Sequence, residues 1–231
     1  MDALRRTISP LFITMSGLIG AGKTTIAREL AEELGVPVYY EPVEDNVYLE
    51  DFYRDMRAHS FALQVYLLNR RYTQHQQIVW GRQGGVQDRS IYEDSVFARV
   101  LMKQGYLTLR DYETYRALFQ TMSTYLPHPH FIVHLDVTPE EALVRIKERS
   151  RGCEAGIPLD YLKALYEEYN VFLAEISKRI PVLRVRWDKY KTAAELAQEI
   201  SKALVEHQAV IDVAFDSSMT ANIPKVPASL Y

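Results

Sequence analysis

One stretch near the start of the chain has the residue types and spacing that bind phosphate. Gly17-Leu-Ile-Gly-Ala-Gly22-Lys23-Thr24 fits the pattern G-x-x-x-x-G-K-[ST], between an apolar run and a helical pattern. In such a loop the backbone N–H groups turn inward around a phosphate, and the positive end of the following helix adds to the attraction. The predicted triphosphate site consists of Gly17, Leu18, Ile19, Gly20, Ala21, Gly22, Lys23, Thr24 and Thr25. Within it, Lys23 would reach the β- and γ-phosphate oxygens of ATP, and Thr24 would be a ligand of Mg²⁺.

Two carboxylates and an arginine follow other apolar runs of the chain. Glu41 ends the run that starts at Val36, and Asp88 and Arg89 follow the run that starts at Val86. In a parallel sheet the carboxyl ends of the strands lie at one edge, where α/β folds bind their ligands. Each carboxylate taken alone could be a surface residue that ends a strand. Together with Lys23 they supply what phosphoryl transfer needs, namely a proton acceptor, a metal-binding carboxylate for Asp88, and a cation.

Short apolar runs alternate with long amphipathic stretches along the chain. Strands are expected at 11–15, 36–41, 86–88, 131–136 and 182–185. Helices are expected at 23–34, 47–56, 61–80, 91–104, 108–126, 139–149 with Thr138 as its cap, 158–179 and 192–206. This alternation predicts an α/β fold of the P-loop NTPase type, a parallel five-stranded sheet with helices on both faces. We expect one domain at 1–206, and we assign no role to the tail at 207–231.

Three arginines lie at and just beyond the end of a predicted helix. Arg145, Arg149 and Arg151 are spaced i, i+4 and i+6 and lead into a polar, glycine-containing turn at 150–157. Basic residues at a helix C-terminus also complement the helix dipole, which is a purely structural explanation. Because guanidinium groups bind phosphate oxygens with two hydrogen bonds, the cluster favours an arginine-rich lid with catalytic arginines.

The composition of the chain limits which partners it can bind and indicates its cellular compartment. The chain has 231 residues, a formal net charge of -3 and a single cysteine, Cys153. A balanced charge argues against nucleic-acid and membrane-surface binding, and no apolar run approaches the ~20 residues of a membrane span. With no intrachain disulfide possible, we expect a cytoplasmic protein.

The segment from Phe61 to Arg71 predicts a helix face suited to recognising a small molecule. Gln64, Leu67 or Leu68, and Arg71 are spaced i, i+3 or i+4, and i+7, which places them on one side of a helix. The amide of a glutamine donates and accepts hydrogen bonds, so it can make a two-point contact with the edge of a base. Arg71 could equally be a solvated charge on that helix.

Several segments taken together resemble one enzyme family. GLIGAGKTT, YYEPV, FALQVYLLNRR, QDRSIYEDSVFA and RIKERSRGCEAGIPLDYL occur in this order and are similar to the deoxynucleoside kinases, nearest the bacterial deoxyadenosine/deoxyguanosine kinase branch. The resemblance covers about residues 11–206. It implies transfer of the ATP γ-phosphate, with Mg²⁺, to the 5′-hydroxyl of a purine deoxynucleoside, with deoxycytidine as a further substrate, in nucleotide salvage. It also implies a homodimer.

The resemblance assigns roles to individual residues. Glu41 would be the general base and Arg89 would orient the 5′-oxygen and the transferring phosphate. Gln64 would contact the base edge, beside a pair formed by Arg71 and Asp94. The implied substrate-binding residues are Glu41, Tyr53, Gln64, Arg71, Asp88, Arg89, Asp94, Phe97 and Glu154. In this set an aromatic ring, Phe97, stacks on the base, and Tyr53 and Glu154 bind the sugar 3′-hydroxyl.

Two other functions remain open at this point. A thymidylate-kinase-like nucleoside monophosphate kinase shares the phosphate loop, an Asp-Arg pair and a lid. Against it, Glu41 would repel a dianionic monophosphate by about 4 kcal/mol per unit charge at ~4 Å and an effective dielectric of ~20. A non-catalytic nucleotide-binding subunit with the same fold would be expected to lack some of Lys23, Glu41, Arg89 and the lid arginines, and all of these are present.

Overall fold

The computed structural model describes residues 11–41, 43, 46–149, 154, 156–187 and 192–208. Within these residues five strands form one parallel sheet, in the order β2-β3-β1-β4-β5. The strands are β1 (Phe12–Gly17), β2 (Val38–Tyr39), β3 (Gly85–Asp88), β4 (Phe131–Asp136) and β5 (Val182–Arg186). The predicted parallel sheet is therefore confirmed, and it places β1 at the centre.

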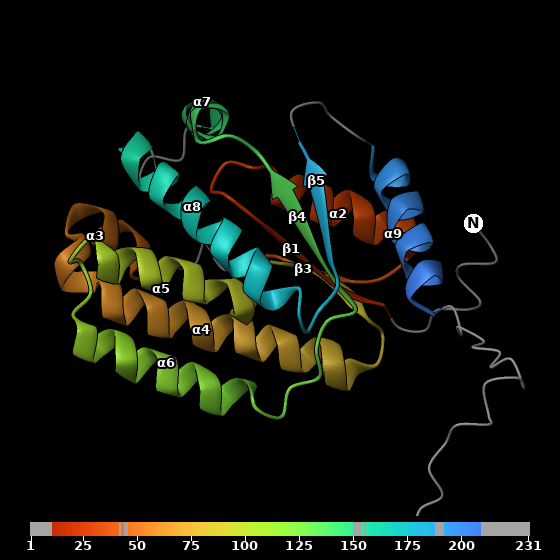
Figure 1. Ribbon diagram of the computed structural model, residues 1–231, viewed down its shortest axis with the longest axis horizontal. Helices are drawn as coiled ribbons and strands as arrows, with labels where there is room; N and C mark the ends of the chain where they lie inside the picture. Colours follow the sequence, from red (N-terminus) through yellow and green to blue (C-terminus); the bar gives the residue numbers. More distant parts are fainter. Residues whose placement is uncertain are drawn as a thin grey trace, which may run out of the picture.

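Helices cover both faces of this sheet (Figure 1). The helices are α2 (Lys23–Leu34), α3 (Leu49–Arg54), α4 (Met56–Gly81), the short η1 (Ile91–Glu93), α5 (Asp94–Lys103), α6 (Leu109–Ser123), α7 (Pro139–Arg149), α8 (Leu159–Ile176) and α9 (Ala193–Gln208). Helices α2 and α9 pack together on one face, whereas α4, α5 and α8 form a layer on the other with α6 outside α4. The predicted fold class is confirmed.

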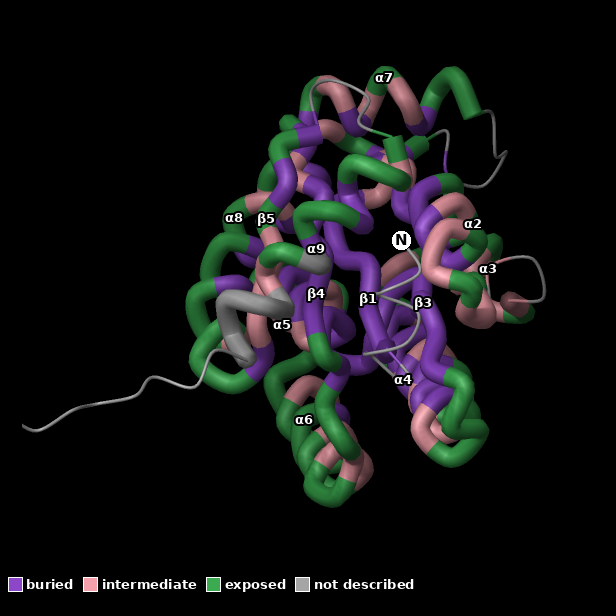
Figure 2. Tube along the Cα trace, turned by 90° about the vertical axis from the view of Figure 1, so that its right-hand side faces the viewer, coloured by how far each residue is buried: buried purple, intermediate pink, exposed green. Residues whose placement is uncertain are grey.

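The central strand explains why the sequence folds this way. All six residues of β1 are buried, as Figure 2 shows for the trace through the middle of the molecule. A parallel strand covered by helices on both faces is buried along its whole length and is mostly apolar, and in this segment only Thr14 and Ser16 are polar. The strand ends at Gly17, so the phosphate loop begins where the buried core reaches the carboxyl edge of the sheet.

The structure corrects several of the expected element bounds. The strand expected at 36–41 is only two residues long, because in this edge strand only Val38 and Tyr39 pair with β3. Glu41 therefore lies beyond the strand. The helix expected at 61–80 begins five residues earlier, since the Asp55 side chain accepts a hydrogen bond from the backbone N–H of Ala58 and caps α4. The helix expected at 158–179 ends at Ile176.

Candidate functional site

A cavity of about 600 Å³ opens at the carboxyl edge of the sheet. It is lined by Ile19, Gly20, Gly22, Lys23, Thr24, Thr25, Glu41, Val43, Asn46, Leu49, Phe52, Tyr53, Leu63, Gln64, Leu67, Arg71, Arg89, Phe97, Arg145, Glu148, Arg149, Glu154 and Tyr161. The wall thus joins the phosphate loop, α3, the middle of α4, the end of α7 and the residues after β2 and β3. Most of the predicted site residues share this one cavity.

The phosphate loop depends on glycines with left-handed backbone. Gly20 and Gly22 have φ of 82° and 89°. A Cβ on Gly20 would lie 2.6 Å from the carbonyl oxygen of Ala142 in α7, so this position also needs the space. Leu18 and Ala21 are buried in the core and can offer a ligand only their backbone.

Lys23 lies inside the loop as the first residue of α2. Its Nζ donates to the carbonyl oxygen of Leu18 at 2.7 Å. The whole residue is 5% exposed. Burial, together with the charge of Arg89, lowers the pKa of Lys23 to about 8. A buried ammonium group with so few partners is well placed to meet phosphate oxygens.

Thr24 and Asp88 form the part of the site that fits a cation. The Thr24 hydroxyl donates to Oδ2 of Asp88 at 2.5 Å. Oδ1 of Asp88 is buried and has no hydrogen-bond partner among the described residues. Burial, and then the charge of Glu41, raise the pKa of Asp88. Asp88 itself is not part of the cavity wall, so it lies behind Thr24, and this pair of oxygens fits Mg²⁺ bound near Thr24.

Glu41 lies between two guanidinium groups. Its Oε1 accepts from Nη2 of Arg71 at 2.6 Å and lies 3.0 Å from Nε of Arg89. Burial alone would raise the pKa of Glu41, but Arg89, Arg71 and Lys23 outweigh it and lower this pKa to about 2. Both contacts end on Oε1, and Oε2 has no partner among the described residues, so one oxygen of an ionised carboxylate stays available to the cavity.

The far end of the cavity contains the predicted base-binding residues. Arg71 pairs with Asp94, and both are buried. Asp94 stands behind Arg71 and is not part of the wall. Oε1 of Gln64 is buried with no hydrogen-bond partner within the described part of the chain. The ring of Phe97 lies 4.9 Å from the guanidinium carbon of Arg89. A polar edge with unused acceptor capacity and a flanking ring suit a heteroaromatic ligand.

Two of the three predicted lid arginines, Arg145 and Arg149, reach the cavity from α7. Arg145 donates to the carbonyl oxygens of Ala21 at 3.3 Å and Trp187 at 3.0 Å, which ties α7 to the phosphate loop. Arg149 pairs with Glu154, and both line the cavity together with Tyr53. The third predicted lid arginine, Arg151, and Cys153 lie outside the described residues.

Sequence reasoning missed three buried residues at this site. Glu93 pairs with Arg89, Tyr169 accepts a hydrogen bond from the same arginine, and Tyr161 lines the cavity. The i, i+4 spacing of Arg89 and Glu93 is no signal for their pairing, because Arg89 lies before η1 and has a left-handed backbone. Nothing in the sequence marks Tyr161 or Tyr169 among the 16 tyrosines of the chain.

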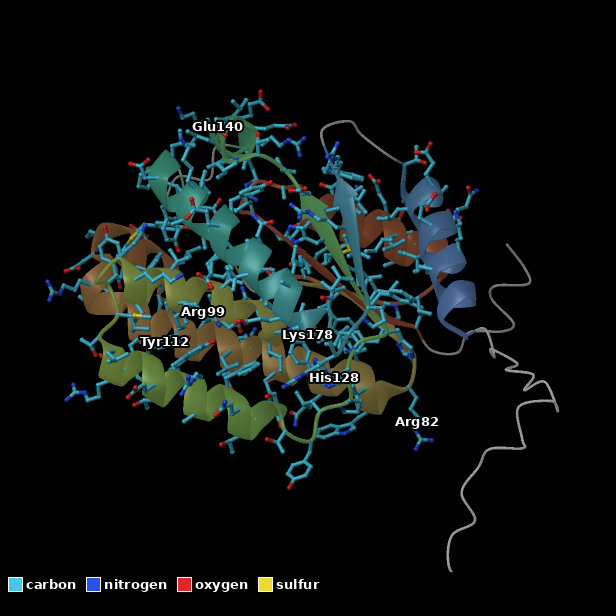
Figure 3. The ribbon with its side chains drawn as sticks, viewed as in Figure 1. Arg82, Arg99, Tyr112, His128, Glu140 and Lys178 are labelled. Atoms are coloured by element: carbon cyan, nitrogen blue, oxygen red, sulfur yellow. The ribbon has the colours of Figure 1, made fainter. Side chains whose placement is uncertain are left out.

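A second cavity, of about 780 Å³, lies between α5, α6 and the end of α8. In Figure 3 its residues Arg99, Tyr112, His128 and Lys178 lie well away from Glu140 on α7. It contains none of the predicted site residues. Of these two cavities, the first combines the phosphate loop with the predicted acceptor residues. Among the described helices, none is long and apolar enough to cross a membrane.

Comparison with known proteins agrees with this geometry. A family model described as deoxynucleoside kinase matches residues 13–209. The chain is 51% identical over 196 residues to a deoxyadenosine kinase of Dictyostelium discoideum, covering 85% of this chain and 80% of the relative. It is 37% identical over 181 residues to a deoxyadenosine/deoxycytidine kinase of Bacillus subtilis, covering 77% and 83% respectively. A solved deoxyadenosine kinase of M. mycoides, with dCMP and dCDP bound, superposes with a TM-score of 0.75 at 28% identity, covering 85% of this chain and 100% of that chain.

Proposed function

The chain belongs to the deoxynucleoside kinase family, and we propose that it transfers the γ-phosphate of ATP to the 5′-hydroxyl of a purine deoxynucleoside. The single observation that carries this proposal is the position of Glu41. It is an ionised carboxylate with one free oxygen, in the same cavity as the phosphate-loop lysine Lys23. A neutral alcohol held between them could lose its proton to Glu41 while it attacks the terminal phosphate.

The remaining residues of the cavity suit in-line transfer without a phospho-enzyme. Lys23 would hold the β- and γ-phosphates, and Arg89 would meet the charge that develops on the transferring group. Arg145 and Arg149 enter from α7, where they would close over the phosphates. Thr24, backed by Asp88, would hold Mg²⁺, which when bound neutralises charge on the phosphate oxygens.

The proposed purine preference rests on the far end of the cavity. Arg71, held by Asp94, and the unpaired Oε1 of Gln64 present donors and an acceptor to the edge of a base. The curated relative at 51% identity is a deoxyadenosine kinase, and a second relative is described as acting on deoxyadenosine and deoxycytidine. We therefore place deoxyadenosine and deoxyguanosine first, with deoxycytidine as a further substrate.

The test is a panel of the four deoxynucleosides with MgATP, scored by kcat/KM. We expect the two purines to lead, with deoxycytidine measurable and thymidine weakest. Thymidine as the best substrate would contradict the proposed purine preference. Activity on none of the four would contradict the proposed function itself.

A nucleoside monophosphate kinase is the alternative that the same panel can exclude. Glu41 carries a full negative charge at neutral pH, and a monophosphate acceptor would bring two more charges to its side of the cavity. Deoxynucleosides should therefore be phosphorylated much faster than their monophosphates. The opposite order would assign the chain to the monophosphate kinases.

We further propose that the enzyme is a homodimer that acts on small molecules and binds no nucleic acid or membrane. The family resemblance is the support for the dimer, and the formal net charge of -3 is the support for the absence of polyanionic partners. Light scattering on the purified protein should give about twice the 26.7 kDa chain mass. A mass of one chain at assay concentration would contradict the dimer.

A further inference from the structure

Glu93 is a buried carboxylate that the proposed chemistry does not use. It is 0% exposed and lies in η1, four residues after Arg89. Its Oε1 accepts from Nη1 of Arg89. The hydroxyl of Tyr169, on α8, accepts a second hydrogen bond from the same nitrogen at 2.7 Å and lies 3.4 Å from Oε1 of Glu93. Groups from two separate elements, η1 and α8, thus meet at one nitrogen of the arginine.

These contacts fix the orientation of the Arg89 guanidinium. Its Nε faces Glu41 at 3.0 Å, its Nη1 is taken by Glu93 and Tyr169, and the ring of Phe97 lies 4.9 Å from its carbon. Nη2 makes no hydrogen bond to any described residue. The arginine also has a left-handed backbone, with φ of 69°, which is costly for a residue other than glycine and persists only where its surroundings hold it. The two N–H donors of Nη2 are therefore left for phosphate oxygens.

The same contacts also limit how Arg89 binds Glu41. A free guanidinium would pair with a carboxylate through two parallel hydrogen bonds and occupy both of its oxygens. Here the contacts at Nη1 hold the guanidinium in an orientation in which Nε lies 3.0 Å from Oε1 of Glu41. Nη2, which lies on the same side of the guanidinium as the Nε–H, makes no hydrogen bond to Oε2 of Glu41 in this orientation. The second oxygen of Glu41 is left for the sugar hydroxyl.

We propose that Glu93 and Tyr169 are positioning residues that aim Arg89 at the transferring phosphate and keep it from closing on the general base. This inference rests on the proposed function. The competing explanation is that Glu93 only neutralises a buried arginine. Glu168 offers a matched example of that purely structural role, because it is 2% exposed and pairs with Arg99 and Lys103 away from the cavity.

The test compares Glu93→Gln with Glu168→Gln, each of which removes a buried charge and keeps the side-chain shape. For Glu93→Gln we expect kcat to fall about tenfold or more, with the KM for the deoxynucleoside changed less than about threefold. Glu168→Gln should lower Tm with kcat unchanged. Tyr169→Phe, which removes one hydroxyl, should lower kcat in the same direction but by less.

A double-variant cycle decides whether Glu93 acts through Arg89. In an Arg89→Lys background there is no forked guanidinium to aim, so adding Glu93→Gln should cause no further loss of kcat. Losses that multiply in the double variant would overturn the proposal, as would a Glu93→Gln variant with normal kcat and only a lower Tm. Failure of the proposed function would give a different result, because the wild-type protein itself would then phosphorylate no deoxynucleoside. In that case this inference would be wrong as well.

Discussion

The contacts of Glu41 keep its carboxylate ionised but involve only one of its two oxygens. Its pKa of about 2 means that the carboxylate is in the proton-accepting form at every pH used to assay an enzyme. The cost of this arrangement is a weaker base, because the same two arginines that keep it ionised also stabilise its charge. The arrangement suits a reaction in which a positioned acceptor is needed as the alcohol attacks.

Glu41→Gln should separate this role from nucleotide binding. The amide keeps the shape but cannot accept the alcohol proton, so kcat should fall about 10²- to 10⁴-fold. The Kd for ATP, measured by calorimetry, should stay within about a factor of three, because no hydrogen bond or ion pair joins Glu41 to a described residue of the phosphate loop. A variant that turns over deoxynucleosides at the wild-type rate would show that another group accepts the proton.

Lys23 gives a pH dependence with a definite sign. Burial and Arg89 lower its pKa from 10.5 to about 8, so in the free enzyme its charge is present below pH 8 and is lost above it. Because kcat/KM reports the free enzyme, kcat/KM for MgATP should fall above about pH 8. In Lys23→Arg the guanidinium stays charged, so whatever activity remains should lack this fall. A flat wild-type profile up to pH 10 would contradict the role of Lys23.

At the residue scale, the position of a residue at the cavity can be predicted where a local pattern of the sequence marks it. The lysine of the phosphate loop, the carboxylate after the second apolar run and the Asp-Arg pair could all be predicted because each follows directly from a strand or loop signature. Tyr169 could not, because it lies 80 residues from its partner Arg89 and only the packing of α8 brings them together. The Thr24–Asp88 contact likewise depends on β1 lying beside β3.

At the element scale, the phosphate loop is held in place by α7. Gly20 lies against the backbone of α7, and Arg145 of that helix donates back to the loop at Ala21. The loop and the helix that carries the lid arginines are therefore one packed unit. A change at their contact should affect catalysis even though Gly20 has no side chain.

Gly20→Ala tests this contact, with Gly35→Ala as its control. Both glycines have left-handed φ, but a Cβ on Gly35 meets nothing within 4 Å, whereas one on Gly20 meets the Ala142 carbonyl oxygen at 2.6 Å. Gly35→Ala should lose only about 1–2 kcal/mol of stability from backbone strain, with kcat unchanged. Gly20→Ala should lose more stability, and kcat/KM for ATP should fall about 10²-fold. Equal effects of the two variants would rule out the contact with α7.

Element bounds were predictable where capping and periodicity define them. The bounds of α2 could be predicted to the residue, because the lysine of the loop starts the helix and Gly35 ends it in left-handed conformation. The length of β2 could not, because an edge strand ends where its pairing partner ends, and that register is a property of the assembled sheet. The early start of α4 depends on the cap that Asp55 forms. This cap could not be recognised from the sequence, because it lies near the break between two apolar patterns.

At the scale of the whole molecule, the chain order and the spatial order of the strands differ. Parallel pairing and helices on both faces follow from the alternation of patterns, but the order β2-β3-β1-β4-β5 does not. That order places β1 between β3 and β4. The phosphate loop, which follows β1, and the Asp88-Arg89 pair, at the end of β3, therefore lie at the ends of neighbouring strands. The cavity is a consequence of this arrangement.

The C-terminal boundary of the domain can be tested from the packing of α9. This helix packs on α2, which directly follows the phosphate loop, and its Leu196 and Ile200 are 1% and 0% exposed. All of the described residues that line the cavity precede it, and the family match ends at residue 209. The folded domain should therefore need α9 but nothing after it.

Two truncated chains test this C-terminal boundary of the domain. A chain that ends after Gln208 should keep the Tm and the kcat/KM of the full-length protein. A chain that ends before α9, at residue 191, exposes the apolar face of α2 and loses two buried side chains worth about 1.5–3 kcal/mol each. Its Tm should fall by many degrees, and its affinity for ATP should fall with it because α2 supports the loop. A loss of activity on removing only 209–231 would instead give the tail a role in the site, and would move the domain boundary to the end of the chain.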